Sequence, residues 1–114
     1  MLSYWMQTVE NKTVLEQRTI DIPTPGPKQI LVRLHAASLN RGEFVIGHGL
    51  HKGGQANAIG MEGAGVVSAL GSEVKGIAVG DKVMGRCRGA FAEYACMDAV
   101  EALPVPANLS FEQA

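Results

Sequence analysis

The segment that most constrains the fold of this chain runs from Gly60 to Val83 and reads GMEGAGVVSALGSEVKGIAVGDKV. It carries glycine at positions 60, 63, 65, 71, 76 and 80, around two short apolar runs. Only glycine accepts a positive φ without steric penalty, and glycine inside a strand often marks a bulge or the close approach of another backbone. We therefore expect residues 64–70 to form a strand that enters and leaves through tight corners, as in a small barrel. An acid, Glu62, lies beside the first corner.

Length and charge narrow the class of protein. A chain of 114 residues can bury the core of one domain, and its net charge of −1 offers no footprint for nucleic acid or an acidic membrane surface. No signal peptide and no apolar run of about 18 residues is present, so no membrane contact and a cytoplasmic location are expected. The two cysteines, Cys87 and Cys96, are predicted to be free thiols, as a reducing compartment favours.

Short apolar or alternating segments recur along the chain with turn residues between them. The expected strands are residues 3–9, 13–20, 30–38, 64–70, 82–86, 90–97 and 100–103. The first two form a predicted hairpin, and the three prolines within residues 23–27 predict an extended connector after it. In residues 30–38 the alternation predicts a half-buried strand that leaves His35 solvated. Many short strands of this kind are typical of a small barrel or sandwich.

The last residues carry a helix start. Ser110 is followed three residues later by Gln113, which is the capping-box pattern, and Leu109 precedes the cap. Since a helix of one turn is not stable alone, we expect it to continue beyond Ala114 in a longer protein.

Two histidines lie in the glycine-rich residues 47–55. His48 and His51 are three residues apart, a spacing that could place two metal ligands on one face of a helix. The glycines argue against a helix, and no third ligand type lies nearby, so no metal site is expected there.

Six motifs follow one another in a fixed order. They are PGP with ILVR (25–33), ASLN (37–40), GMEGAGVV (60–67), GS with VGDKV (71–83), GAFAEY (89–94) and PVP with LSFE (104–112). Their order and spacing resemble the medium-chain dehydrogenase/reductase family, and within it the zinc-independent quinone oxidoreductase branch. The resemblance implies that residues 1–114 form a mainly β, GroES-like, partly open β-barrel with short helical turns. It also implies that this is the substrate-side domain of a two-domain enzyme, cut before a Rossmann domain.

The resemblance implies an oxidoreductase in which NADPH or NADH delivers a hydride to a quinone, an enone or an enoyl substrate. No G-x-G-x-x-G follows a strand in this chain, so the chain alone is not expected to hold the dinucleotide or to turn over. A homodimer of the full-length protein is also implied, through the absent Rossmann half.

Zinc is not expected. In the zinc-dependent branch a cysteine stands at the place of Asn40 and a histidine at the place of Met61, and neither Asn nor Met is a suitable zinc ligand here. The loop that carries four structural cysteines in that branch is represented by residues 85–89, which contain only Cys87.

Two residues are predicted to be catalytic. By resemblance Asn40 lies near the nicotinamide ribose and the substrate, where its amide offers donors and an acceptor, so it is also predicted to bind the cofactor. The alternative is that Asn40 only caps a turn at residues 40–46. Glu62 would hold a loop or polarise a neighbouring group at the floor of the cleft between the two domains of the enzyme. Its alternative is a structural pairing with a basic residue, and that alternative is the favoured one.

Further residues complete the predicted site. Arg41 is predicted to bind a phosphate group of the cofactor. The substrate pocket is predicted to include Phe44, Val45, Met61 and Arg88. Because Val45 stands where a related enzyme often has a tyrosine, the preference for quinones stays open. The alternatives are a zinc-type alcohol dehydrogenase homologue and a non-enzymatic β-barrel binding module, and the helix start at Ser110 argues against the second.

Overall fold

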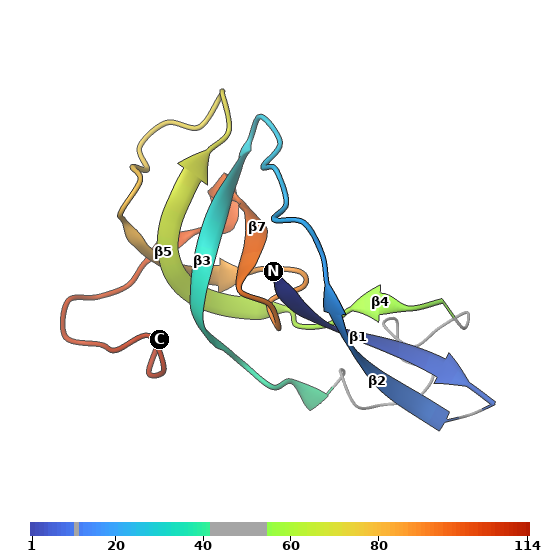
Figure 1. The fold of residues 1–114 in the computed structure, drawn as a ribbon. Coiled ribbons are helices and arrows are strands. Elements are labelled where there is room, and N and C mark those ends of the chain that lie inside the picture. Colours follow the sequence, from blue (N-terminus) through green and yellow to red (C-terminus); the bar gives the residue numbers. More distant parts are fainter. Residues whose placement is uncertain (11, 42–54) are drawn as a thin grey trace.

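The computed structural model describes residues 1–10, 12–41 and 55–114, which fold into two antiparallel sheets (Figure 1). The smaller sheet has the order β2-β1-β4, with β1 at Leu2–Val9, β2 at Lys12–Thr19 and β4 at Asn57–Ala58. The larger has the order β7-β3-β5-β6-β8, with β3 at Gln29–Ala37, β5 at Glu62–Leu70, β6 at Lys82–Arg86, β7 at Tyr94–Asp98 and β8 at Leu103–Pro104. A 3-10 turn, η3, spans Ala99–Glu101. The predicted class, a mainly β and partly open barrel, is confirmed.

The core lies on one face of the five-stranded sheet. Its buried side chains come from the central strands and their neighbours, and they are Ile30, Val32, Val67, Val83, Cys87, Ala90, Ala95 and Met97. The alternation predicted for residues 30–38 places Ile30 and Val32 fully inside and leaves Arg33 and His35 exposed. Burial of apolar side chains from every strand except the short β8 makes this sheet the stable part of the domain.

Two glycines make the predicted corner possible. Gly60 has a φ of 104°, and a Cβ there would lie 2.7 Å from the backbone nitrogens of Ala90 and Phe91. Gly65 lies inside β5, where a Cβ would overlap the carbonyl oxygen of Arg33 on β3. The register between β3 and β5 shifts next to this point, and Figure 1 shows β5 bending around β3. The strand begins at Glu62, two residues earlier than predicted, because this ladder continues through the glycines.

The prediction of one strand over residues 90–97 is wrong in its first half. Strand β7 begins at Tyr94, and residues 90–93 cross to the smaller sheet. There Tyr4 N donates to the Phe91 carbonyl at 2.9 Å, and Phe91 N donates to the Ile59 carbonyl at 3.1 Å. This crossing segment ties the two sheets together through backbone hydrogen bonds.

The predicted strand at residues 100–103 is also wrong. Ala102 N bonds to the Ala99 carbonyl and closes the 3-10 turn η3, which leaves Val100 94% exposed. Only Leu103 and Pro104 pair with β6, at the edge of the sheet, where proline is tolerated because no partner needs its missing N–H.

Other expectations hold. The β1–β2 hairpin matches the prediction within one residue at each end, and residues 20–26 belong to no strand. The capping box is present: Ser110 N donates to Gln113 Oε1 at 3.0 Å, and Gln113 N donates to Ser110 Oγ at 3.2 Å. Among the described residues, no helix has the length and apolar character needed to cross a membrane.

Candidate functional site

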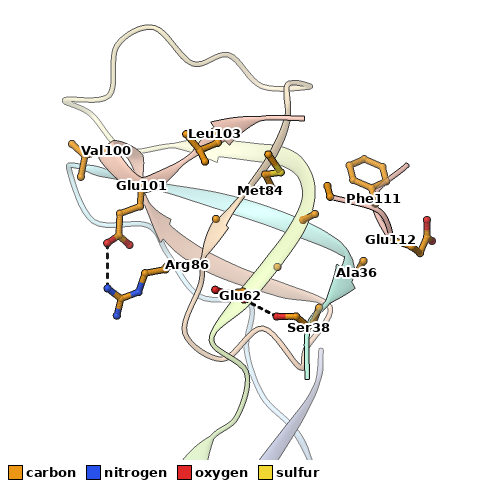
Figure 2. A pocket seen from close by; sticks show the side chains of 15 residues that line it. Ala36, Ser38, Glu62, Met84, Arg86, Val100, Glu101, Leu103, Phe111 and Glu112 are labelled. Carbon is orange, nitrogen blue, oxygen red and sulfur yellow. Dashed lines mark hydrogen bonds and ion pairs between the residues drawn. The ribbon is translucent and has the colours of Figure 1, made fainter. Parts of the chain in front are cut away.

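A pocket of about 610 Å³ lies where β3, β5 and β6 meet residues 100–103 and the last turn of the chain (Figure 2). Small residues of β3 and β5 form one wall, namely Ala36, Ala37, Gly63 and Ala64. Larger apolar side chains stand around it, namely Met84, Val100, Leu103 and Phe111. A cavity of this size with apolar walls is suited to a small organic ligand.

Ser38, Asn40 and Glu62 form a polar cluster beside this pocket, in which Ser38 and Glu62 line the pocket and Asn40 contacts both of them. The Ser38 hydroxyl donates to Glu62 Oε2 at 2.9 Å, and Asn40 Nδ2 lies 3.4 Å from the same oxygen and 3.5 Å from Ser38 Oγ. Ser38 N also donates to the Glu62 carbonyl at 3.3 Å, one step past the last β3–β5 pair, Ala37 with Gly63. The ladder therefore brings the first residue of β5 beside the residue that follows β3.

A second charged group lies on another side of the pocket. Arg86 Nη1 is 3.7 Å from Glu101 Oε1, with side chains 65% and 38% exposed. Solvent screens a pair as open as this, so it contributes little to stability. The pair places one cation and one anion at the rim of the pocket, as Figure 2 shows.

Phe111 closes the pocket on the side of the chain end. The capping box fixes the turn that begins at Ser110, and the Phe111 ring stacks on His35 with ring centroids 4.4 Å apart. The Lys82 ammonium lies 5.8 Å from the centre of the same ring, on the pocket-lining strand β6. The exposure predicted for His35 is correct, and its ring helps to hold this turn against the barrel.

The structure brings the two predicted catalytic residues together. Glu62 lines the pocket, is exposed, and contacts Ser38 and Asn40, so the expected pairing with a basic residue is not found among the described residues. Arg41 follows Asn40 and is exposed.

The remaining predicted residues are less closely placed. Met61 is half-buried, and its carbonyl accepts a hydrogen bond from Cys87 N at 2.7 Å. Arg88 is exposed in the turn after β6. Neither residue lines this pocket or a second one of about 490 Å³ between β3, β1 and residues 90–93. Phe44 and Val45 lie outside the described residues.

Sequence reasoning missed Ser38, Arg86 and Glu101. A signal existed for Ser38, which belongs to the ASLN motif and lies two residues before Asn40. Arg86 is the residue of β6 that pairs with Glu62 across the ladder, and only the β5–β6 register reveals this. Glu101 reaches the pocket because η3 replaces the expected strand.

The two cysteines are free, as predicted, and neither is activated. Burial, with a smaller contribution from the negative charge of a Cys96 thiolate, raises the pKa of Cys87 to about 12. Burial also raises the pKa of Cys96. The thiol of Cys87 lies 3.6 Å from the Cys96 carbonyl oxygen. Since the thiolate is the nucleophile, both thiols are poor candidates for catalysis.

Within residues 1–10, 12–41 and 55–114, no group of three or more His, Cys, Asp or Glu side chains is arranged to hold a metal ion. The two histidines of the glycine-rich loop, His48 and His51, lie outside these ranges. The polar cluster offers one carboxylate, one hydroxyl and one amide, a set suited to hydrogen bonding with a ligand.

Several known proteins are similar to this chain in sequence or in fold. The chain is 36% identical over 107 residues to the human synaptic vesicle membrane protein VAT-1 homolog, covering 91% of this chain and 27% of that protein. It is 33% identical over 106 residues to the trans-enoyl reductase RAP2 of Pyricularia oryzae, covering 85% and 30%. The Escherichia coli quinone oxidoreductase complexed with NADPH superposes with a TM-score of 0.84 at 30% identity, covering all of this chain and 36% of that one.

The chain therefore spans about a third of the length of these relatives. The model of the alcohol dehydrogenase GroES-like domain matches residues 26–107, which include strands β3 to β8 and most of the pocket wall. The chain belongs to the family of alcohol dehydrogenase GroES-like domains.

Proposed function

We propose that this chain forms the substrate side of an NAD(P)H-dependent oxidoreductase that reduces quinones or activated C=C bonds without zinc. The observation that carries the proposal is the cluster of Ser38, Asn40 and Glu62 at the edge of an apolar pocket of about 610 Å³. A largely apolar pocket with a few convergent polar groups is the usual form of a small-molecule site. The resemblance to a quinone oxidoreductase complexed with NADPH and to a trans-enoyl reductase supports this chemistry.

The residues of the pocket fit the nicotinamide end of such a cofactor. When bound, the cofactor supplies the hydride, and the protein supplies orientation. The Asn40 amide, with donors and an acceptor, is suited to hydrogen bonds with ribose hydroxyls or a carboxamide. The apolar wall around Ala64 and Met84 would keep water away from the carbon that accepts the hydride.

Residues beyond the pocket keep proposed roles. Arg41, exposed beside Asn40, would neutralise a cofactor phosphate. Phe44, Val45, Met61 and Arg88 are proposed to belong to the substrate site.

We also propose that the domain works with a Rossmann-type domain on the same chain. The relatives are about three times as long as this chain, and no G-x-G-x-x-G after a strand is present in the sequence to bind the dinucleotide. The homodimer implied for the full-length protein would form through that second domain, and sedimentation of the full-length protein tests it.

The test is consumption of NADPH and NADH by the longer protein that carries this domain. We expect turnover with quinones, enones or enoyl thioesters, and less than stoichiometric zinc by elemental analysis. Stoichiometric zinc with oxidation of alcohols would instead establish the zinc-type alternative. Failure to bind either nucleotide would support a non-enzymatic binding module.

A second measurement tests the role proposed for Asn40. Asn40→Ala in the longer protein is expected to weaken cofactor binding and to lower turnover, measured by nicotinamide fluorescence and by steady-state kinetics. If both quantities stay unchanged, the role proposed for Asn40 is wrong.

A further inference from the structure

The side chains of the polar cluster are hydrogen-bonded to one another in a defined arrangement. Glu62 Oε2 accepts the Ser38 hydroxyl at 2.9 Å, and Asn40 Nδ2 lies within 3.5 Å of both Glu62 Oε2 and Ser38 Oγ. Two side chains that follow β3 thus converge on one carboxylate oxygen of Glu62, the first residue of β5. Hydrogen bonds to an ionised carboxylate are stronger than those between neutral groups.

The chemistry of an amide allows only one orientation beside this carboxylate. An asparagine side chain has a donor end, Nδ2, and an acceptor end, Oδ1, which are similar in shape. If the amide were turned over, Oδ1 would face Glu62 Oε2, and two acceptors would lie in contact. The Glu62 carboxylate therefore favours Nδ2 toward itself and Oδ1 away from itself.

The backbone also holds Ser38 and Glu62 next to each other. Ser38 N donates to the Glu62 carbonyl at 3.3 Å, so the two residues are held together before their side chains meet. The Ser38 hydroxyl then fixes Oε2, the oxygen that the Asn40 amide contacts. Ser38 sets the position of Glu62, and Glu62 sets the direction of the amide.

We propose that Ser38 and Glu62 are positioning residues that orient the side-chain amide of Asn40. This rests on the proposed function only in taking Asn40 as the residue that meets the cofactor. It gives Glu62 a role at the site without proton transfer and without a basic partner. It also adds Ser38 to the residues on which cofactor binding depends.

The first experiment follows the Asn40 side-chain NH₂ pair by ¹H–¹⁵N NMR of the chain, with the pair identified by its loss in Asn40→Asp. Ser38→Ala and Glu62→Gln are each expected to shift this pair, and Ser38→Thr, which keeps the hydroxyl, is expected to restore it. Ser72→Ala and Glu73→Gln are matched controls in the exposed turn after β5, and they should leave the pair unmoved.

The second experiment is a double-mutant cycle in the longer protein, with the dissociation constant of NADPH as readout. Ser38→Ala alone should raise it by roughly three- to ten-fold, the range expected when a typical hydrogen bond is lost. In an Asn40→Ala background the same change should have almost no effect, because the amide to be oriented is gone.

The outcomes separate the two proposals. An Asn40 NH₂ pair that moves in neither Ser38→Ala nor Glu62→Gln overturns the positioning role, whatever Asn40→Ala does to activity. Additive effects in the cycle overturn it as well. A pair that shifts as expected, while Asn40→Ala leaves NADPH binding unchanged, supports the orientation and removes the functional role proposed for Asn40.

Discussion

Strands β2 and β3 differ in length by one residue, yet they lie in very different surroundings. In β3, which has a neighbour on each side, Ile30, Leu31 and Val32 are buried. In β2, an edge strand paired only with β1, no residue is buried, and Leu15 is 59% exposed. Strand β2 therefore depends on its backbone ladder and surface contacts, whereas the five-stranded sheet depends on packing. Changes of the same kind should have unequal effects in the two regions.

The largest effect is expected for Gly65→Ala in the five-stranded sheet. The new Cβ would overlap the Arg33 carbonyl oxygen and lie 2.8 Å from its carbon, both of which are backbone atoms of the paired strand. Backbone cannot yield as a side chain can, so we expect a loss of more than about 4 kcal/mol or failure to fold. Chemical denaturation followed by circular dichroism measures this.

Gly26→Ala is the matched control, since a Cβ there would meet only the Gln29 side chain at 3.4 Å or more. It should change the free energy of unfolding by less than about 1 kcal/mol. Equal effects of the two alanines would contradict the close approach of β3 and β5 at Gly65.

The next largest effect concerns the thiol in the core. With its pKa raised to about 12 by burial, Cys87 should be alkylated at pH 8 about a thousand times more slowly than a thiol with a pKa of 9. The pKa is raised, so the thiolate fraction and the rate should grow with pH up to about 12. Mass spectrometry of peptides labelled with iodoacetamide gives the rates.

The labelling rate of Cys87 also distinguishes opening of the five-stranded sheet from opening of the hairpin. A substitution that loosens the five-stranded sheet should accelerate it, whereas one that opens only the hairpin should not. Cys96, half-buried and also with a raised pKa, should react faster than Cys87. Similar rates for the two thiols would contradict the burial of Cys87.

A pair of truncations compares the regions directly. Ile30→Ala removes a side chain with no exposed surface, so we expect a loss of about 2–5 kcal/mol. Leu15→Ala removes a side chain that is 59% exposed, and less than about 1 kcal/mol should be lost. Urea denaturation of both variants measures the difference, and equal losses would mean that β2 is covered by another part of the protein.

Much of this arrangement could be predicted because it is local. The Gly60 corner, the β1–β2 hairpin and the Ser110–Gln113 capping box each depend on residues close in sequence, and each is confirmed. Alternation also placed Ile30 and Val32 inside and His35 outside. Propensity and turn chemistry act over a few residues, so a single sequence can reveal them.

The errors have a common physical cause. Residues 90–93 alternate as a strand would, but alternation does not say which sheet the backbone bonds to, and this segment crosses to the other one. The Ser38–Glu62 contact joins residues 24 apart, and it depends on the β3–β5 register. A bulge shifts such a register by one residue, and the pattern alone does not locate the bulge.

The smallest effect is expected for Arg18→Ala in the hairpin. The Arg18 guanidinium lies 4.5 Å from the centre of the Trp5 ring, and its Nη2 is 2.7 Å from Glu16 Oε2. Both partners of this ion pair are at least 36% exposed, so the substitution should cost about 0.5–1 kcal/mol, mostly through the lost cation–π contact. Because Trp5 is the only tryptophan, its fluorescence reports the hairpin selectively. Arg18→Lys keeps the cation and should recover part of the loss. A loss above about 2 kcal/mol, or faster labelling of Cys87 in Arg18→Ala, would mean that the hairpin and the five-stranded sheet unfold as one unit.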